Sequence, residues 1–82
     1  MTNKEKYEQA FITCFSLEKT ALNDELVYNS LPEWDSVGHM AMITVLEETF
    51  NIMIETDDIV DFSSYNKGFE ILEKYGVTFN SI

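Results

Sequence analysis

Residues 35–50, DSVGHMAMITVLEETF, carry the clearest helical pattern in this 82-residue chain and decide its fold. Asp35 or Ser36 can serve as the N-cap of a helix that ends near Phe50. At about 100° per residue the side chains sort into two stripes. The stripe expected to face the core contains His39, Met42, Ile43, Leu46 and Phe50. The opposite stripe contains Val37, Ala41, Thr44 and Glu48, with Met40 and Glu47 at its rim, and it is less polar than a merely solvated face would be.

Three further helical segments flank this helix. Thr2 and Glu5 stand at capping-box spacing and predict a helix over residues 3–16. Residues 57–62 predict one short turn with the three carboxylates Asp57, Asp58 and Asp61 in solvent, and a last helix follows Ser63 or Ser64 and ends near Gly76. Residues 17–34 predict a long ordered loop, and residues 52–54 a shorter one. We therefore expect an all-α fold of one domain, residues 1–82 with a core of roughly 3–76: a small four-helix bundle with three longer helices, one short helix and a long first loop.

The charge balance restricts the possible partners. Fifteen Asp and Glu face five Lys and no Arg, for a formal charge of −10. Such a chain is repelled by nucleic acids and by anionic membranes, and it suits basic protein surfaces. No stretch is apolar enough for membrane insertion, and the single Cys14 excludes an internal disulfide, so a cytoplasmic monomer is expected.

Ser36 is the candidate functional residue. A serine in the first turn of a helix is most often a cap, but Asp35 can fill that role here and leave the Ser36 hydroxyl free. The serine also ends a long loop, where a reactive group is accessible. Unpaired N–H groups and the positive end of the helix dipole would favour a phosphate attached at this point.

Asp35-Ser36-Val37, followed by Leu46-Glu47-Glu48, Phe50 and Ile52-x-Ile54, resembles the acyl carrier proteins of fatty-acid and polyketide synthesis. The resemblance runs from about Asp35 to Tyr75. It implies a bundle of the acyl-carrier type in which Ser36 carries a covalent 4′-phosphopantetheine arm. A phosphopantetheinyl transferase would attach the arm from coenzyme A, with Asp35 helping to position that enzyme and its metal ion. An acyl or aminoacyl group would travel on the arm as a thioester, and the chain itself would catalyse nothing.

The resemblance also implies a docking face on the helix that follows Ser36. Its expected residues are Val37, Met40, Ala41, Glu47 and Glu48, and its partners are loading ligases and transferases with basic surfaces. Gly38, Ala41 and Met53 stand where many fatty-acid carriers have acidic residues, which favours a specialised biosynthetic pathway over bulk fatty-acid synthesis. Ile59, Phe62 and Phe69 are bulky where such carriers shelter their cargo, which favours a short or polar cargo, whereas Gly68 would open space there.

Several alternatives stay open. The cargo class could be that of a D-alanyl or peptidyl carrier, or the chain could be an acidic protein-interaction module in which Ser36 is an unmodified cap. A serine hydrolase using His39 lacks the first Gly of a nucleophile elbow and the parallel sheet that holds one. No metal site is expected: Asp57, Asp58 and Asp61 do not match a calcium loop, and one Cys with one His does not make a usual zinc site.

Overall fold

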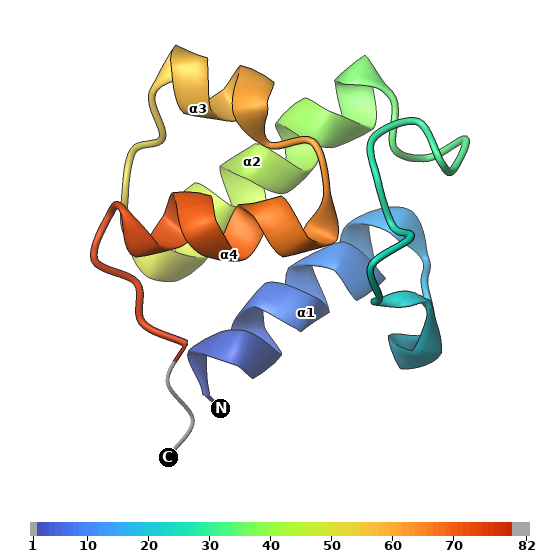
Figure 1. Cartoon of the computed structure of the whole chain (residues 1–82), viewed down its shortest axis with the longest axis horizontal. Coiled ribbons are helices and arrows are strands. Elements are labelled where there is room, and N and C mark those ends of the chain that lie inside the picture. Colours follow the sequence, from blue (N-terminus) through green and yellow to red (C-terminus); the bar gives the residue numbers. More distant parts are fainter. Residues whose placement is uncertain (1, 80–82) are drawn as a thin grey trace.

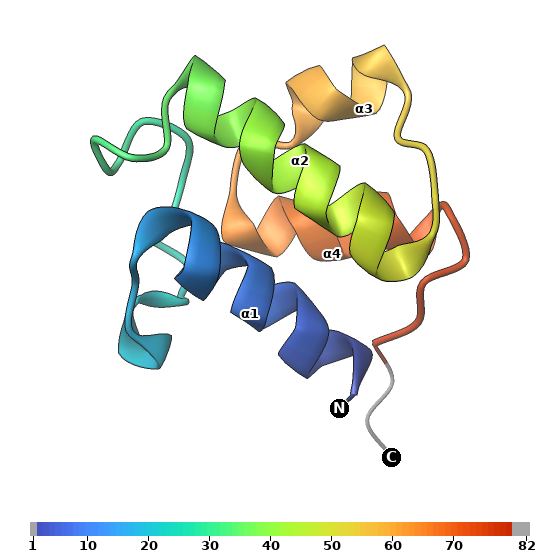
Figure 2. The same cartoon turned by 180° about the vertical axis from the view of Figure 1, so that it is seen from behind.

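The computed structural model describes residues 2–79, and within them every regular element is a helix. The elements are α1 (Asn3–Phe15), a 3-10 turn η1 (Lys19–Ala21), α2 (Ser36–Phe50), α3 (Thr56–Asp61) and α4 (Tyr65–Glu73). Helices α1, α2 and α4 form the body of the molecule, α3 lies on the side away from α1, and the long loop lies at the end where α1 finishes and α2 begins (Figures 1 and 2). The expectation of a small helical bundle with three longer helices and a short one is confirmed.

Each longer helix begins at the cap that its sequence indicates. The Thr2 hydroxyl accepts the N–H of Glu5, and the Glu5 carboxylate accepts the N–H of Thr2, which completes the capping box of α1. The side chain of Asp35 caps α2, and that of Ser64 caps α4. Helix α2 ends at Asn51, which adopts the left-handed conformation that asparagine tolerates, with φ of 54°.

The core is rich in aromatic side chains. Tyr7, Phe11 and Phe15 of α1 are buried against Trp34 of the long loop and Phe62 after α3. On α2 the predicted inward stripe is confirmed for His39, Met42, Ile43 and Leu46, which are buried, whereas its last residue, Phe50, is half-buried. Each such apolar side chain contributes roughly 1.5–3 kcal/mol by leaving water, so the helices are held together mainly by these faces.

The long loop is held at two places. Leu26 and Trp34 are buried, with Trp34 fully inaccessible to solvent. The loop backbone also pairs with the link between α3 and α4: the N–H of Tyr28 donates to the carbonyl of Ser63, and the N–H of Tyr65 donates to the carbonyl of Leu26. These contacts fix the segment that leads into Ser36.

One surface prediction is wrong. Asp57 and Asp61 are exposed, but Asp58 is buried, with only 7% of its surface exposed. Its carboxylate accepts hydrogen bonds from the Lys74 ammonium group and the Tyr75 hydroxyl, which lie just beyond α4. The hydroxyl of Tyr75 also accepts the N–H of Glu55, so this cluster ties the beginning of α3 to the end of α4.

Helix α4 ends at Glu73, with Lys74 as its C-cap, slightly before the predicted Gly76. The chain still turns at Gly76, whose φ of 88° is the left-handed conformation that glycine permits. The N–H of Val77 donates to the carbonyl of Leu72 across this turn, as in a helix-ending motif closed by glycine.

Within residues 2–79 there is no helix with the length and apolar character needed to cross a membrane.

Candidate functional site

Ser36 is the first residue of α2 and is exposed. The carboxylate of Asp35 accepts the N–H of Gly38 at 2.9 Å, so Asp35 and not Ser36 supplies the helix cap. The serine hydroxyl therefore has no capping task, and it stands at the end of the helix where N–H groups point outward. This arrangement is the one that the sequence predicts for the two residues.

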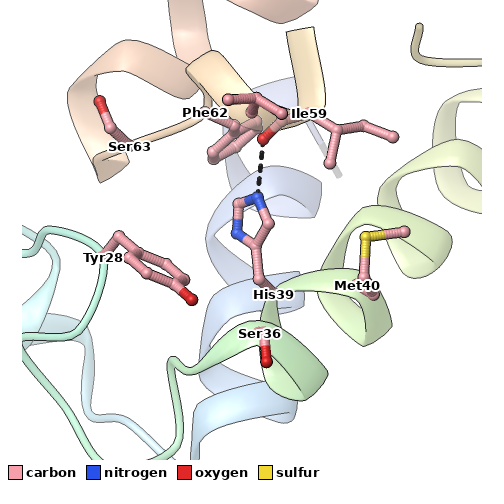
Figure 3. Close-up of a pocket in the computed structure, with 8 residues that line it drawn as sticks. Tyr28, Ser36, His39, Met40, Ile59, Phe62 and Ser63 are labelled. Atoms are coloured by element: carbon pink, nitrogen blue, oxygen red, sulfur yellow. Dashed lines mark hydrogen bonds between the residues drawn. The ribbon is translucent and has the colours of Figure 1, made fainter. Parts of the chain in front are cut away.

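A pocket of about 330 Å³ adjoins Ser36. It lies between the long loop, the first turns of α2 and the end of α3 (Figure 3). Its walls are predominantly apolar, and its lining residues are Tyr28, Ser36, His39, Met40, Ile59, Val60, Phe62 and Ser63. Ser36 lies at the edge of this pocket with its hydroxyl pointing away from His39 (Figure 3), so a chain attached to that oxygen starts in solvent and reaches the pocket only by folding back.

His39 forms part of the pocket wall and connects three segments. The indole N–H of Trp34 donates to His39 Nδ1 at 2.9 Å. Because Nδ1 accepts, the proton of the neutral ring belongs on Nε2, which lies 2.8 Å from the carbonyl oxygen of Ile59 and donates to it. The two rings are nearly parallel, with an interplanar angle of 17° and centroids 6.2 Å apart, so the hydrogen bond joins them edge to edge. His39 therefore joins the loop before Ser36, helix α2 and helix α3.

The same geometry bears on the hydrolase alternative. Both ring nitrogens of His39 are already engaged, and in Figure 3 the ring points toward Ile59 while the Ser36 hydroxyl points away from it. A general base must lie within hydrogen-bond reach of its proton donor. The two residues are close in sequence, but they are not arranged as base and nucleophile.

The predicted docking residues fall into two groups. Val37 (77% exposed), Met40 (48% exposed), Ala41 and Glu48 lie on the open surface of α2. Glu47 is half-buried, and its carboxylate accepts the N–H of Ile54, so it also holds the link between α2 and α3. The face of α2 that follows Ser36 is therefore apolar, with the exposed Asp35 before it and carboxylates farther along the helix.

Packing requires a glycine at position 38, and the sequence alone does not reveal this. A Cβ at this position would overlap the carbonyl oxygen of Glu33 and press on the ring of Phe15. The absence of a side chain lets the long loop pass close to the first turn of α2. An acidic side chain is thus sterically excluded here.

Sequence reasoning missed Val60, Tyr28 and Ser63 as neighbours of Ser36. Val60 is 76% exposed on α3, and all three residues line the pocket. An exposed valine between acidic residues was the available signal for Val60, but its proximity to α2 depends on how α3 crosses the bundle. Tyr28 and Ser63 come together through the backbone pairing of two loops.

The negative charge is unevenly distributed along the chain. All five lysines lie in residues 1–19 and 67–82, where five carboxylates balance them. The other ten carboxylates lie in residues 20–66, so this segment carries the entire formal charge of −10. The segment includes α2, α3, most of the long loop and every residue that lines the pocket beside Ser36.

Cys14 is the single cysteine of the chain and lies on α1. It is half-buried against the core, and burial raises the pKa of its thiol. A raised pKa lowers the fraction of reactive thiolate at neutral pH, so Cys14 has the properties of a packing residue.

Comparisons of the chain with protein-family models, with curated proteins and with solved structures find no match.

Proposed function

We propose that this chain is a carrier protein whose Ser36 holds a 4′-phosphopantetheine arm. The arm carries an acyl or aminoacyl group as a thioester, and partner enzymes load and remove that group. The observation that supports this most strongly is the exposed Ser36 at the beginning of α2, with its capping task taken over by Asp35. The resemblance of residues 35–75 to acyl carrier proteins supplies the chemistry.

The beginning of α2 is a favourable place for the phosphodiester that would join the arm to Ser36. Helix α2 is 15 residues long and presents its unpaired N–H groups and positive dipole end at Ser36. No lysine or arginine lies within residues 20–66 to hold a phosphate more tightly. The arm would therefore be anchored by its covalent bond and remain free to swing, as delivery between enzymes requires. A tether of this kind replaces diffusion of a scarce intermediate by a high effective concentration at each partner.

The partners follow from the charge distribution. A segment with ten carboxylates and no lysine favours rapid encounter with basic surfaces. Val37 and Met40 next to Ser36 then give a partner an apolar contact at the centre of the interface. The proposed partners are the phosphopantetheinyl transferase that attaches the arm and the ligases or transferases that load it. We place these enzymes in a specialised biosynthetic pathway.

Transfer of the arm tests the proposal. The protein is incubated with coenzyme A, Mg²⁺ and a broad-specificity phosphopantetheinyl transferase, and its intact mass is measured. A gain equal to one phosphopantetheine is expected, and Ser36→Ala should abolish it. Ser30→Ala serves as the matched control, because Ser30 is also exposed but lies in the loop. A wild-type protein that gains no mass would leave an acidic interaction module as the remaining interpretation.

A further inference from the structure

The pocket beside Ser36 has a closed floor. His39 is 8% exposed, Phe62 is 1% exposed, and their rings meet edge to face with centroids 5.9 Å apart. The hydrogen bonds to Trp34 and Ile59 hold the imidazole in place. These two side chains separate the pocket from the interior of the bundle.

Behind Phe62 the core is packed with other rings. Its centroid lies 6.4 Å from that of Tyr7 and 6.3 Å from that of Phe11. Tyr7 is itself fixed, because its hydroxyl donates to the backbone carbonyl of Tyr65 at 2.7 Å. A chain that passed Phe62 would have to displace side chains held by aromatic contacts and by a buried hydrogen bond.

Gly68 does not provide an alternative route. The missing side chain of Gly68 leaves a space that the Tyr7 hydroxyl and the Phe62 ring already fill, since an added Cβ would overlap both. The expectation that this glycine opens room for cargo is therefore wrong. The room is used to pack the two rings.

We infer that the pocket accepts only a short acyl or aminoacyl group, and that Phe62 sets this length limit. This inference rests on the proposed function. The volume of about 330 Å³ lies at the lower end of the range of roughly 300–1,000 Å³ for small-molecule sites. The apolar walls from Met40, Ile59 and Val60 suit a small aliphatic group. A longer chain stays outside the bundle, so the cargo is presented to partner enzymes and is not sheltered.

A series of acyl groups tests the limit in the wild-type protein. Acetyl, butyryl, octanoyl and palmitoyl forms are made with the transferase and the corresponding acyl-coenzyme A, and each is verified by mass before its Tm is measured. Every additional buried methylene would raise the Tm measurably. We expect the Tm to rise up to butyryl and to change no further for octanoyl and palmitoyl. A steady rise through palmitoyl would overturn the inference while leaving the carrier function intact.

Phe62→Ala tests the role of the ring. In this variant the Tm should continue to rise with chain length, because the floor of the pocket is open. Phe69→Ala is the matched control: it removes a half-buried ring outside the pocket lining and should keep the wild-type plateau. A folded Phe62→Ala protein with the same plateau would refute the assignment to Phe62, and if the variant does not fold, the wild-type series still decides the length limit.

A second route makes the test independent of the transferase. In a Cys14→Ala background, Ser36→Cys can be coupled to alkyl methanethiosulfonates of graded length, which form mixed disulfides at position 36. These adducts lack the pantetheine, so their alkyl chains begin at the sulfur that Ser36→Cys introduces. Their Tm should rise while the alkyl chain fills the pocket and then level off, at a chain length of its own. If the transferase then adds no mass to the protein, that result counts against the proposed function alone. A Tm that keeps rising with alkyl length counts against the closed floor of the pocket.

Discussion

Replacing His39 by phenylalanine should destabilise the protein well beyond the effect of a surface change. The substitution retains a ring of similar size but removes both nitrogens. The indole N–H of Trp34, in a side chain with 0% exposure, would lose its acceptor, and the carbonyl of Ile59 would lose its donor. A buried polar group left without a partner costs about 1–3 kcal/mol. Because Ile59 is only partly buried, the expected loss in the free energy of unfolding is about 2–4 kcal/mol.

Urea denaturation measured by far-UV circular dichroism gives this free energy directly. In a domain of this size each kcal/mol lowers the Tm by roughly 4–8 °C, so a thermal scan should show the same change. The control is Val60→Ala, which truncates an exposed side chain on the same pocket and should stay within about 0.5 kcal/mol of wild type. A His39→Phe protein as stable as this control would refute the role assigned to the two hydrogen bonds.

A double-mutant cycle separates the hydrogen bond from packing. Trp34→Phe removes the indole donor, so in the His39→Phe background it should cost less than it does in wild type. The expected coupling lies in the range of about 0.5–3 kcal/mol for residues in direct contact. Strictly additive effects would mean that the indole–imidazole bond contributes nothing to stability.

Three other changes address separate parts of the structure. Gly68→Ala should cost about 1–3 kcal/mol in urea, because the new methyl overlaps the Phe62 ring; an unchanged midpoint would contradict this packing. Hydrogen bonding, chiefly from Lys74, lowers the pKa of Asp58 below its ordinary 3.8. The ionised Asp58 carboxylate therefore stabilises the fold above that pH, and this contribution is lost as the pH falls through the lowered pKa. The difference in the free energy of unfolding between wild type and Asp58→Asn should become smaller on acidification. A difference that does not depend on pH would contradict the pairing. Asp35→Ala should lose about 0.5–2 kcal/mol of stability because the helix cap is removed, whereas Asp35→Asn keeps the cap. If the Asp35 carboxylate positions the transferase, both variants should accept the arm more slowly. A normal rate for Asp35→Asn would assign Asp35 to capping alone.

The helices were predictable because each is encoded by neighbouring residues. The stripe from His39 to Leu46, the capping box at Thr2 and Glu5, and the end of the helix near Phe50 all depend on spacings of a few positions. The cap at Asp35 was predictable for the same reason. These local signals were sufficient for the order and the approximate ends of the helices.

The features that were missed depend on residues distant in sequence. Asp58 looked like one of three solvated carboxylates, and only the fold brings Lys74 and Tyr75 to it from 16 and 17 positions away. The partners of His39 include a backbone carbonyl 20 positions later, which carries no sequence signature. Gly68 looked like free space because its neighbours Tyr7 and Phe62 lie on other segments.

The most direct test of the account is to locate the arm by fragmentation mass spectrometry of the transferase-treated protein. Residues 20–66 contain no lysine or arginine, so trypsin leaves Ser30, Ser36, Ser63 and Ser64 in one peptide. That peptide must be fragmented to show which serine carries the arm. We predict a single phosphopantetheine on Ser36. An arm attached to one of the other serines, or none at all, would contradict the account.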